Sequence, residues 1–171
     1  FGNAAVAARH AQLELGLERV AIIDWDVHHG NGTEAMFRGD NSVLFVSMHQ
    51  WPFYPGTGGP GTSDETTLNA PLPAGADDAV YLQAFTERVE PAVRSFAPDA
   101  LIVSAGFDAH REDDLGQLGL VEADYEWITL RIKAVADRYA RGRIVSCLEG
   151  GYNLSALARS VAVHLRVLAG V

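Results

Sequence analysis

Two kinds of metal-binding side chain follow the first apolar run of the sequence at a spacing that suits a cation. Asp26 and His28 stand two positions apart, directly beyond the apolar residues 20–24. Alternate residues of an extended segment point the same way, so a carboxylate oxygen and an imidazole nitrogen would face a common ligand. Asp108, which follows a later apolar run, could supply a third donor. Three protein ligands that leave one coordination position open are typical of a catalytic zinc.

Other interpretations of these residues compete with a catalytic metal. The trio could form a buried ion network that needs no metal. A structural zinc would need cysteines, and the chain contains one, Cys147. Asp24 shares the orientation of Asp26 but lies deeper, where a carboxylate needs a partner such as a second cation or a charged histidine.

Alternating apolar and amphipathic stretches predict the elements that position these residues. Strands are expected over residues 20–24, 42–48, 100–105 and 143–148, and helices over residues 4–17, 34–37, 79–96, 122–140 and 154–168. The helix over residues 79–96 should be interrupted or stopped near Pro91, and the proline- and glycine-rich residues 49–68 should form a long loop. Such alternation implies a parallel sheet covered on both faces, with ligands bound beyond the carboxyl ends of its strands.

The last expected strand leads into a phenol. Gly150 and Gly151 precede Tyr152, and they would let the backbone pass close to a substrate while the phenol points into the site. Tyr152 could instead be a core tyrosine with a satisfied hydroxyl group. Its position at a strand end favours the functional interpretation.

Composition limits the class of protein. The chain has 171 residues, a formal net charge of -9 and a pI of about 5.0. These values fit one globular domain and exclude an electrostatic nucleic-acid binder, which needs a basic face. A lone cysteine indicates a reducing compartment, so a cytoplasmic location is expected, and no apolar run is long enough to cross a membrane. The acidic residues 112–114 should form a solvated loop, or else attract a cationic substrate.

The beginning of the chain also carries an expectation. Phe1, Gly2 and Asn3 form neither an initiator methionine nor a signal peptide, and a helical pattern follows at once. We therefore expect residues 1–171 to be a single, partial domain of a longer protein.

Four segments resemble the signature blocks of the histone deacetylases. They read DWDVHHGNGTE, SMHQWPFYPGTG, SAGFDAH and CLEGGYNL, and they occur in the family's order over essentially the whole chain. The sequence is most similar to the class II-like branch, which includes bacterial deacetylases and acetylpolyamine amidohydrolases, and it corresponds to the C-terminal part of the catalytic domain. The resemblance implies an α/β, three-layer arginase/deacetylase-type fold with a mostly parallel sheet, here incomplete at its N-terminal side.

The resemblance also implies roles for individual residues. The zinc ligands would be Asp26, His28 and Asp108, and Tyr152 would donate a hydrogen bond to the acetyl oxygen as it becomes an oxyanion. A potassium site would use the side chains of Asp24 and Ser47 and the carbonyls of Asp26, His28 and Met48. A second monovalent cation would lie near the carbonyls of Phe37, Asp40 and Val43. The substrate tunnel would include Tyr54 as an aromatic wall, Gly151 beside the zinc and Leu115 at the gate.

The sequence departs from the family pattern in two respects. The adjacent histidines that provide the general base precede the blocks found here, so His28 and His29 are not that pair. His29 is expected to lie behind the zinc ligands and hydrogen-bond near the metal. Asn31 stands where some relatives have aspartate, and it would orient one of the absent histidines without adding charge. The chain alone is therefore expected to turn over little substrate.

Three functions follow from these observations. The leading hypothesis is a zinc amidohydrolase that removes acetyl groups from acetyl-lysine in proteins or from acetylated polyamines, and an apolar Leu115 at the gate disfavours polyamines. The alternatives are an arginase-like ureohydrolase with two manganese ions and a catalytically incomplete metal-binding fragment. The stretch of residues 26–30 lacks the extra carboxylate of the manganese motif. The sequence predicts no contact with nucleic acid or membrane, allows an oligomer, and does not separate zinc from iron(II).

Overall fold

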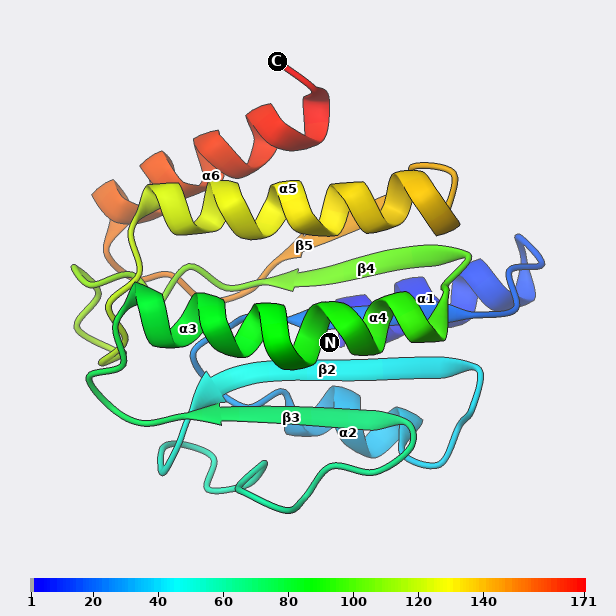
Figure 1. Cartoon of the computed structure of the whole chain (residues 1–171), viewed down its shortest axis with the longest axis horizontal. Coiled ribbons are helices and arrows are strands. Elements are labelled where there is room, and N and C mark those ends of the chain that lie inside the picture. Colours follow the sequence, from blue (N-terminus) through cyan, green and yellow to red (C-terminus); the bar gives the residue numbers. More distant parts are fainter. Residues whose placement is uncertain (1) are drawn as a thin grey trace.

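The chain folds around a parallel sheet. The computed structural model describes residues 2–171, and Phe1 lies outside them. The sheet has five strands in the order β3-β2-β1-β4-β5, all parallel (Figure 1). The strands are β1 (Val20–Asp24), β2 (Val43–Gln50), β3 (Thr67–Leu72), β4 (Ala100–Ala105) and β5 (Ile144–Leu148).

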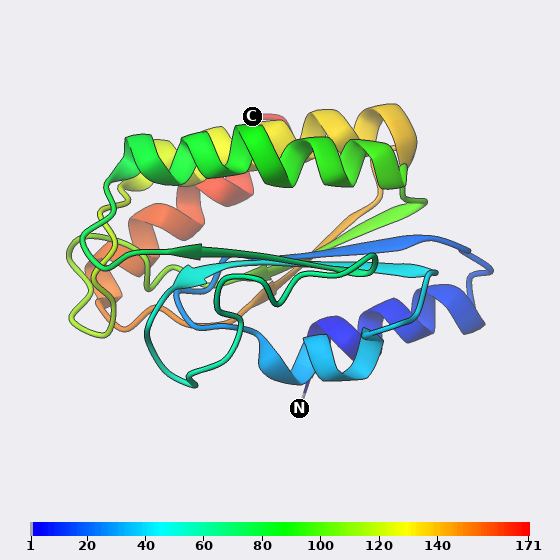
Figure 2. The same cartoon turned by 60° about the horizontal axis from the view of Figure 1, so that its bottom comes forward.

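Helices cover both faces of this sheet, which makes three layers. One face carries α1 (Asn3–Leu13) and α2 (Asn31–Phe37). The other carries α3 (Asp78–Ala84), the π-helix η1 (Phe85–Val89), α4 (Glu90–Phe96), α5 (Glu122–Tyr139) and α6 (Leu154–Ala169), as Figure 2 shows from the side. Alternate residues of β1 enter different cores: Ala21 and Ile23 pack toward α3–α6, whereas Val20 and Ile22 pack toward α1 and α2.

The register brings the ends of neighbouring strands together. Asp24 of β1 pairs with Ser47 of β2 on one side and with Ser104 of β4 on the other. The segments that leave β1, β4 and β5 therefore begin at one edge of the sheet, as expected for ligand sites of parallel α/β proteins.

The α/β fold class and the four expected strands are confirmed, but the expected loop over residues 49–68 was too long. Its last residues enter the edge strand β3, which the sequence concealed because Pro71 lies within it. Proline is tolerated on an edge strand, where its missing N–H costs no ladder bond. The interruption expected near Pro91 is a π turn rather than a break, and α4 starts directly after η1.

The expectation of cover on both faces holds for the central strands and not for β5. β1, β2 and β4 are buried along their whole length, whereas Val145 and Leu148 of β5 are 51% and 59% exposed. Strand β5 is the other edge of the sheet.

Among residues 2–171 no helix is both long and apolar enough to cross a membrane.

A buried histidine joins α6 to the sheet. His164 of α6 is 3% exposed and shares hydrogen bonds with Thr129 of α5 (2.8 Å) and Ser146 of β5 (2.9 Å). Its ring lies edge-on to Trp25, with centroids 5.4 Å apart. Burial lowers the pKa of His164 from 6.5 to about 4.

This histidine should make the fold sensitive to acid. Because its pKa is lower in the folded state, the unfolded chain binds the proton more readily, and the stabilisation that is complete above pH 6.5 is lost as the pH falls toward 4. The loss from this one group between pH 7 and pH 5 is about 2 kcal/mol. Denaturant unfolding should show a decrease smaller by that amount in His164→Gln, whose amide can keep both hydrogen bonds. Equal decreases in the two proteins would contradict this account.

Candidate metal centre

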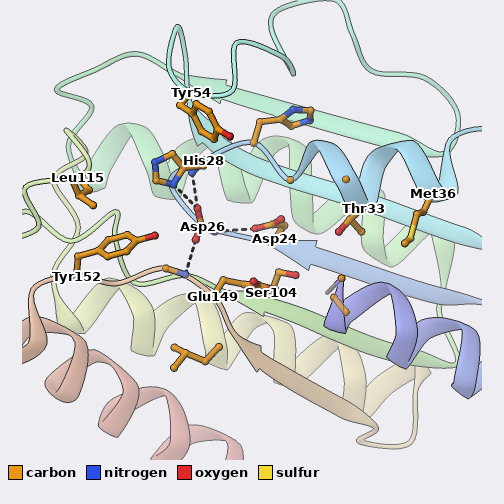
Figure 3. A pocket seen from close by; sticks show the side chains of 17 residues that line it. Asp24, Asp26, His28, Thr33, Met36, Tyr54, Ser104, Leu115, Glu149 and Tyr152 are labelled. Atoms are coloured by element: carbon orange, nitrogen blue, oxygen red, sulfur yellow. Dashed lines mark hydrogen bonds and ion pairs between the residues drawn. The ribbon is translucent and has the colours of Figure 1, made fainter.

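Three predicted ligands meet at the carboxyl edge of the sheet. Asp26 and His28 lie just after β1 and Asp108 just after β4, and their ligand atoms all lie within 4.8 Å of one another. His28 Nδ1 is 3.0 Å from Asp26 Oδ1 and 3.3 Å from Asp108 Oδ2. Figure 3 shows Asp26 and His28 at the cavity, with the phenol of Tyr152 directed toward them. Two carboxylates and an imidazole therefore converge from separate segments.

Backbone amides hold both oxygens of Asp26 and one oxygen of Asp108. Asp26 accepts hydrogen bonds from the N–H groups of His28 and Gly150, both at 2.8 Å. Asp108 Oδ1 accepts one from Val27, also at 2.8 Å. These bonds tie the ends of β1, β4 and β5 together while they orient the carboxylates.

The other oxygen of Asp108 tests whether a cation fits. Asp108 Oδ2 is fully buried and accepts no hydrogen bond from the described residues. His28 Nδ1 lies near it but is hydrogen-bonded to Asp26. A buried carboxylate oxygen without a donor is costly. The residues fit a divalent cation bound by two oxygens and one nitrogen, the donor types of catalytic zinc.

Glycines leave the space that this arrangement needs. A Cβ on Gly150 would lie 2.1 Å from Asp108 Oδ2 and 2.6 Å from Asp26 Oδ2. A Cβ on Gly106 would lie 2.4 Å from the Cα of Asp26. The close approach of the β4 and β5 segments to Asp26 is thus possible only without side chains at these two positions.

The charges of the three groups are strongly coupled. The carboxylates of Asp108 and Asp26, 3.3 and 3.0 Å from Nδ1, raise the pKa of His28 to about 10. Burial raises the pKa of Asp108; it opposes ionisation of Asp26 too, but hydrogen bonds from His28 and Gly150 bring the pKa of Asp26 below its usual value. The site thus favours positive charge between the two carboxylates. A cation that binds His28 Nδ1 must displace a proton.

A cavity of about 660 Å³ opens over Asp26 and His28, two of the three predicted ligands. Tyr54, Leu115 and Tyr152 line it and are 76%, 50% and 56% exposed. Figure 3 shows their side chains around the position of Asp26 and His28. Phe53, which from the sequence could either line a substrate entrance or hold the long loop in place, stacks on the His28 ring with centroids 5.3 Å apart.

Gly151 lies beside the cavity residues without lining the cavity itself. Its φ of 137° is one that L side chains rarely adopt. A Cβ there would meet Leu157 of α6 at 2.8 Å, so the side of this glycine where a side chain would stand faces α6. The predicted tunnel role of Gly151 remains a prediction that concerns its backbone.

The predicted potassium residues lie one layer below the trio. Asp24 and Ser47 are adjacent across β1 and β2, and both are buried. Burial and the neighbouring Asp26 raise the pKa of Asp24 well above its usual value. Its Oδ1 accepts the N–H of Asp26 at 3.0 Å, and Ser47 Oγ lies 2.9 Å from His49 Nδ1. A buried carboxylate in need of positive charge is present, as the sequence suggested.

The second predicted cation position consists of two tight turns. The carbonyls of Phe37 and Asp40 accept the N–H groups of Asp40 and Val43, at 2.9 and 3.0 Å. The Asp40 carboxylate is bound by Ser42 and by Arg9 at 2.7 Å. The three residues therefore lie in two successive turns that meet at Asp40, and a role in cation binding remains a prediction.

His29 and Asn31 lie elsewhere. The ring nitrogens of His29 contact Thr57 Oγ1 and Glu34 Oε2, both at 2.7 Å, so its hydrogen bonds point away from the trio. Asn31 is exposed at the first turn of α2. The structure does not bring either side chain into hydrogen-bonding contact with Asp26 or Asp108.

One acidic residue was misjudged from the sequence. Residues 112–114 were expected to be solvated, but Asp113 is 4% exposed and accepts backbone N–H groups from Leu115, Tyr152 and Asn153. Glu112 and Asp114 are exposed. Composition does not distinguish these cases, because the donors come from a segment far along the chain.

The fold and the site together define a three-layer α/β protein of the arginase/deacetylase type with a candidate metal centre at the carboxyl edge of its sheet. The family model described as "Histone deacetylase domain" matches residues 1–168. The chain belongs to the histone deacetylase family, as its four sequence blocks predicted.

Relatives and solved structures agree with this family. The chain is 48% identical to "Histone deacetylase 14, chloroplastic" of Arabidopsis thaliana, over 99% of this chain and 41% of that protein. It is 44% identical to a "Probable deacetylase" of Archaeoglobus fulgidus, over 83% and 41%. The crystal structure of the HDA15 HD domain superposes with a TM-score of 0.88 at 40% identity, over 98% of this chain and 49% of that one. The structure of the histone deacetylase Clr3 gives 0.90 at 38%, over 100% and 30%. The chain thus spans half or less of these proteins.

Filling the space at Gly150 should weaken metal binding. In Gly150→Ala the new methyl group would press on Asp108 Oδ2 and Asp26 Oδ2. Substitutions that disturb the support of metal ligands cost roughly 10–100-fold in affinity. Competition with a chromophoric chelator for zinc should show a loss of this size.

Gly32→Ala is the matched control. A Cβ on Gly32 meets nothing within 4 Å, and the residue lies in α2, where alanine is the better helix former. Its zinc affinity should equal that of the unsubstituted protein. Equal affinities for all three proteins would show that the trio does not hold the metal.

Proposed function

We propose that this protein is the metal-binding part of a zinc-dependent amidohydrolase that removes acetyl groups from acetyl-lysine side chains or acetylated polyamines. The observation that carries the proposal is the convergence of Asp26, His28 and Asp108 beneath a cavity that Tyr152 also lines. Membership of the histone deacetylase family supports the same reaction class.

The trio would hold zinc through one oxygen of each carboxylate and His28 Nδ1. When bound there, zinc supplies Lewis acidity toward a carbonyl oxygen and lowers the pKa of water. The same donors accept iron(II), which the activity assay below separates from zinc. Hydrogen bonds from Val27 and Gly150 keep the two carboxylates oriented for this task.

Tyr152 would stabilise negative charge on the acetyl oxygen. Burial and the charges of Asp108 and Asp26 raise the pKa of Tyr152, so the phenol keeps its proton at neutral pH. A protonated phenol can donate a hydrogen bond to an oxygen that becomes an oxyanion as water adds to the carbonyl. Such a donor stabilises the transition state more than the ground state.

The general base is expected from outside the described residues. His29 lines the cavity, but both of its ring nitrogens are engaged, by Thr57 and Glu34. His28 is a proposed metal ligand. The adjacent histidines that the family resemblance implies would supply the base, and residues 1–171 alone should therefore turn over little substrate.

The cavity walls suit an acylated aliphatic amine. Phe53 and Tyr54 present aromatic surface beside His28, and Leu115 adds an apolar side chain. Apolar walls match the methylene stem of lysine. An acidic gate would have favoured a second amine on the substrate, so an exposed Leu115 supports acetyl-lysine over acetylpolyamines.

The two-manganese alternative finds less support. A second metal needs further carboxylates at the same place, and among residues 2–171 the trio is the group whose ligand atoms meet. Asp24 is buried beneath it with Ser47 across the strands, an oxygen-rich place that we assign to potassium. A monovalent cation there would stabilise the charged form of Asp24.

The cysteine content bears on the cellular setting. Cys147 is unpaired in the described part of the chain, which fits a reducing compartment such as the cytoplasm. Relatives include proteins called chloroplastic. The negative net charge suits basic substrates such as lysine-rich protein tails rather than nucleic acid.

The reaction is tested by a substrate comparison. The full-length protein should deacetylate an acetyl-lysine peptide faster than acetylputrescine. A chelator should abolish this activity and added metal should restore it. The metal that restores the higher rate, zinc or iron(II), identifies the cation that the site prefers. Urea release from arginine would instead support the ureohydrolase. No release of acetate from either substrate would sink the proposal.

Removing the phenol hydroxyl should separate catalysis from metal binding. Tyr152→Phe should lower kcat roughly 100-fold or more, the size seen when one oxyanion donor is lost. Zinc affinity should not change, because Tyr152 is not a ligand. A kcat within twofold of the unsubstituted enzyme would remove Tyr152 from the mechanism.

A further inference from the structure

A buried carboxylate lies behind Tyr152 and belongs to no predicted site. Asp113 is 4% exposed, and both of its oxygens accept backbone hydrogen bonds. Oδ2 accepts the N–H of Tyr152 at 2.6 Å and that of Asn153 at 3.0 Å. Oδ1 accepts the N–H of Leu115 at 3.0 Å. One side chain thus holds the segment that carries the phenol and the residue at the cavity mouth.

We infer that Asp113 is a positioning residue, which fixes Tyr152 over the metal trio and sets its separation from Leu115. This inference rests on the proposed function. It adds that the orientation of the phenol depends on a carboxylate whose hydrogen bonds go to other residues than the trio and which does not line the cavity.

The segment around Tyr152 needs such a restraint. On its N-terminal side, Gly150 donates to Asp26 and Gly151 has a φ of 137°, in a region open mainly to glycine. On its C-terminal side, the Asn153 side chain caps α6 by accepting the N–H of Ala156 at 3.0 Å. Two successive glycines would leave Tyr152 free to swing between these anchors. The two hydrogen bonds to Asp113 remove that freedom.

The same carboxylate links the phenol to the cavity mouth. Leu115 and Tyr152 are far apart in the sequence, yet both line the cavity, and Figure 3 shows their side chains next to each other. Besides the bonds to Asp113, Asn153 Nδ2 donates to the carbonyl of Glu112 at 2.9 Å. The loop of residues 112–115 and residues 152–153 therefore form one unit. A change in this unit alters how an acyl group enters and where its oxygen meets the phenol.

Asp113→Asn is the most informative substitution. The amide has nearly the shape of the carboxylate, but its NH₂ end cannot accept, so either the Leu115 amide or those of Tyr152 and Asn153 lose their partner. Hydrogen-exchange mass spectrometry should show at least about tenfold faster exchange at position 115 or at positions 152 and 153 in this variant, and at all three positions in Asp113→Ala, which removes both acceptors. Asp113→Glu keeps the charge and the acceptors and should retain part of the protection. It provides the same readouts if the asparagine variant does not fold.

Asp114→Asn is the matched control for this measurement. Asp114 is the next residue and carries the same charge, but it is exposed. Its substitution should leave exchange at positions 152 and 153 unchanged. Because exchange needs no substrate, this readout stands even if the proposed reaction is wrong, whereas a lack of activity in the unsubstituted enzyme tests that reaction separately.

A double-mutant cycle then distinguishes positioning from general support of the fold. In the full-length zinc-loaded enzyme, Asp113→Ala should lower kcat roughly 10–100-fold, the range expected when a reacting group is misplaced by about 1 Å. The same substitution in the Tyr152→Phe background should cost less than threefold, because the hydroxyl that Asp113 positions is already gone. Equal losses in both backgrounds, unchanged exchange at positions 152 and 153 in Asp113→Ala, or faster exchange there with unchanged kcat would each overturn the inference.

Discussion

The arrangement of the whole carboxyl edge depends on the burial of negative charge. Asp24 ends β1, Asp26 follows it, and Asp108 follows the adjacent strand β4. Asp24 and Asp108 are 5% and 0% exposed. Burial raises the pKa of both, which means that each is costly to ionise where it stands. A single imidazole, His28, supplies the only basic nitrogen among the three donors of the cluster. Groups so placed are stabilised by a cation, so the packing of this edge and its affinity for metal are two results of the same constraint.

Two of these carboxylates, Asp26 and Asp108, join the strand ends through hydrogen bonds and also serve as proposed metal ligands. Val27 and Asp108 are 81 residues apart, and Gly150 and Asp26 are 124 apart, yet each pair is joined by a hydrogen bond of 2.8 Å. These bonds close the ends of β1, β4 and β5 around the site. They also orient both carboxylates and leave Asp108 Oδ2 without a hydrogen-bond donor among the described residues. The glycines at positions 106 and 150 are needed for the same reason, because a methyl group at either position would clash with Asp26 or Asp108. Structural support and ligand orientation cannot be separated here.

The sequence predicted those parts that depend on local pattern and on strand ends. Apolar runs located β1 and β4 at their observed bounds, and the parallel-sheet rule correctly placed Asp26, His28 and Asp108 together. Strand β3 was missed because its pairing with β2 comes from tertiary context while Pro71 argues locally against a strand. Asp113 was missed because its burial depends on N–H groups 39 and 40 residues further along the chain. Local sequence carries no record of such partners, whereas a residue type at the end of a strand does carry information about the site.

The ion-network and metal interpretations of the trio differ in what His28 Nδ1 binds, a proton in the first and a metal cation in the second. Without a cation on Nδ1, the same two carboxylates hold a proton on His28 and raise its pKa to about 10. That charged imidazole is hydrogen-bonded to Asp26 but leaves Asp108 Oδ2 without a donor. An ion network of these three residues alone would therefore leave one buried oxygen unsatisfied. A divalent cation can reach all three donors, because the ligand atoms lie within 4.8 Å of one another. The unsatisfied oxygen of Asp108 is therefore the feature that distinguishes a site built for a metal from a structural ion pair.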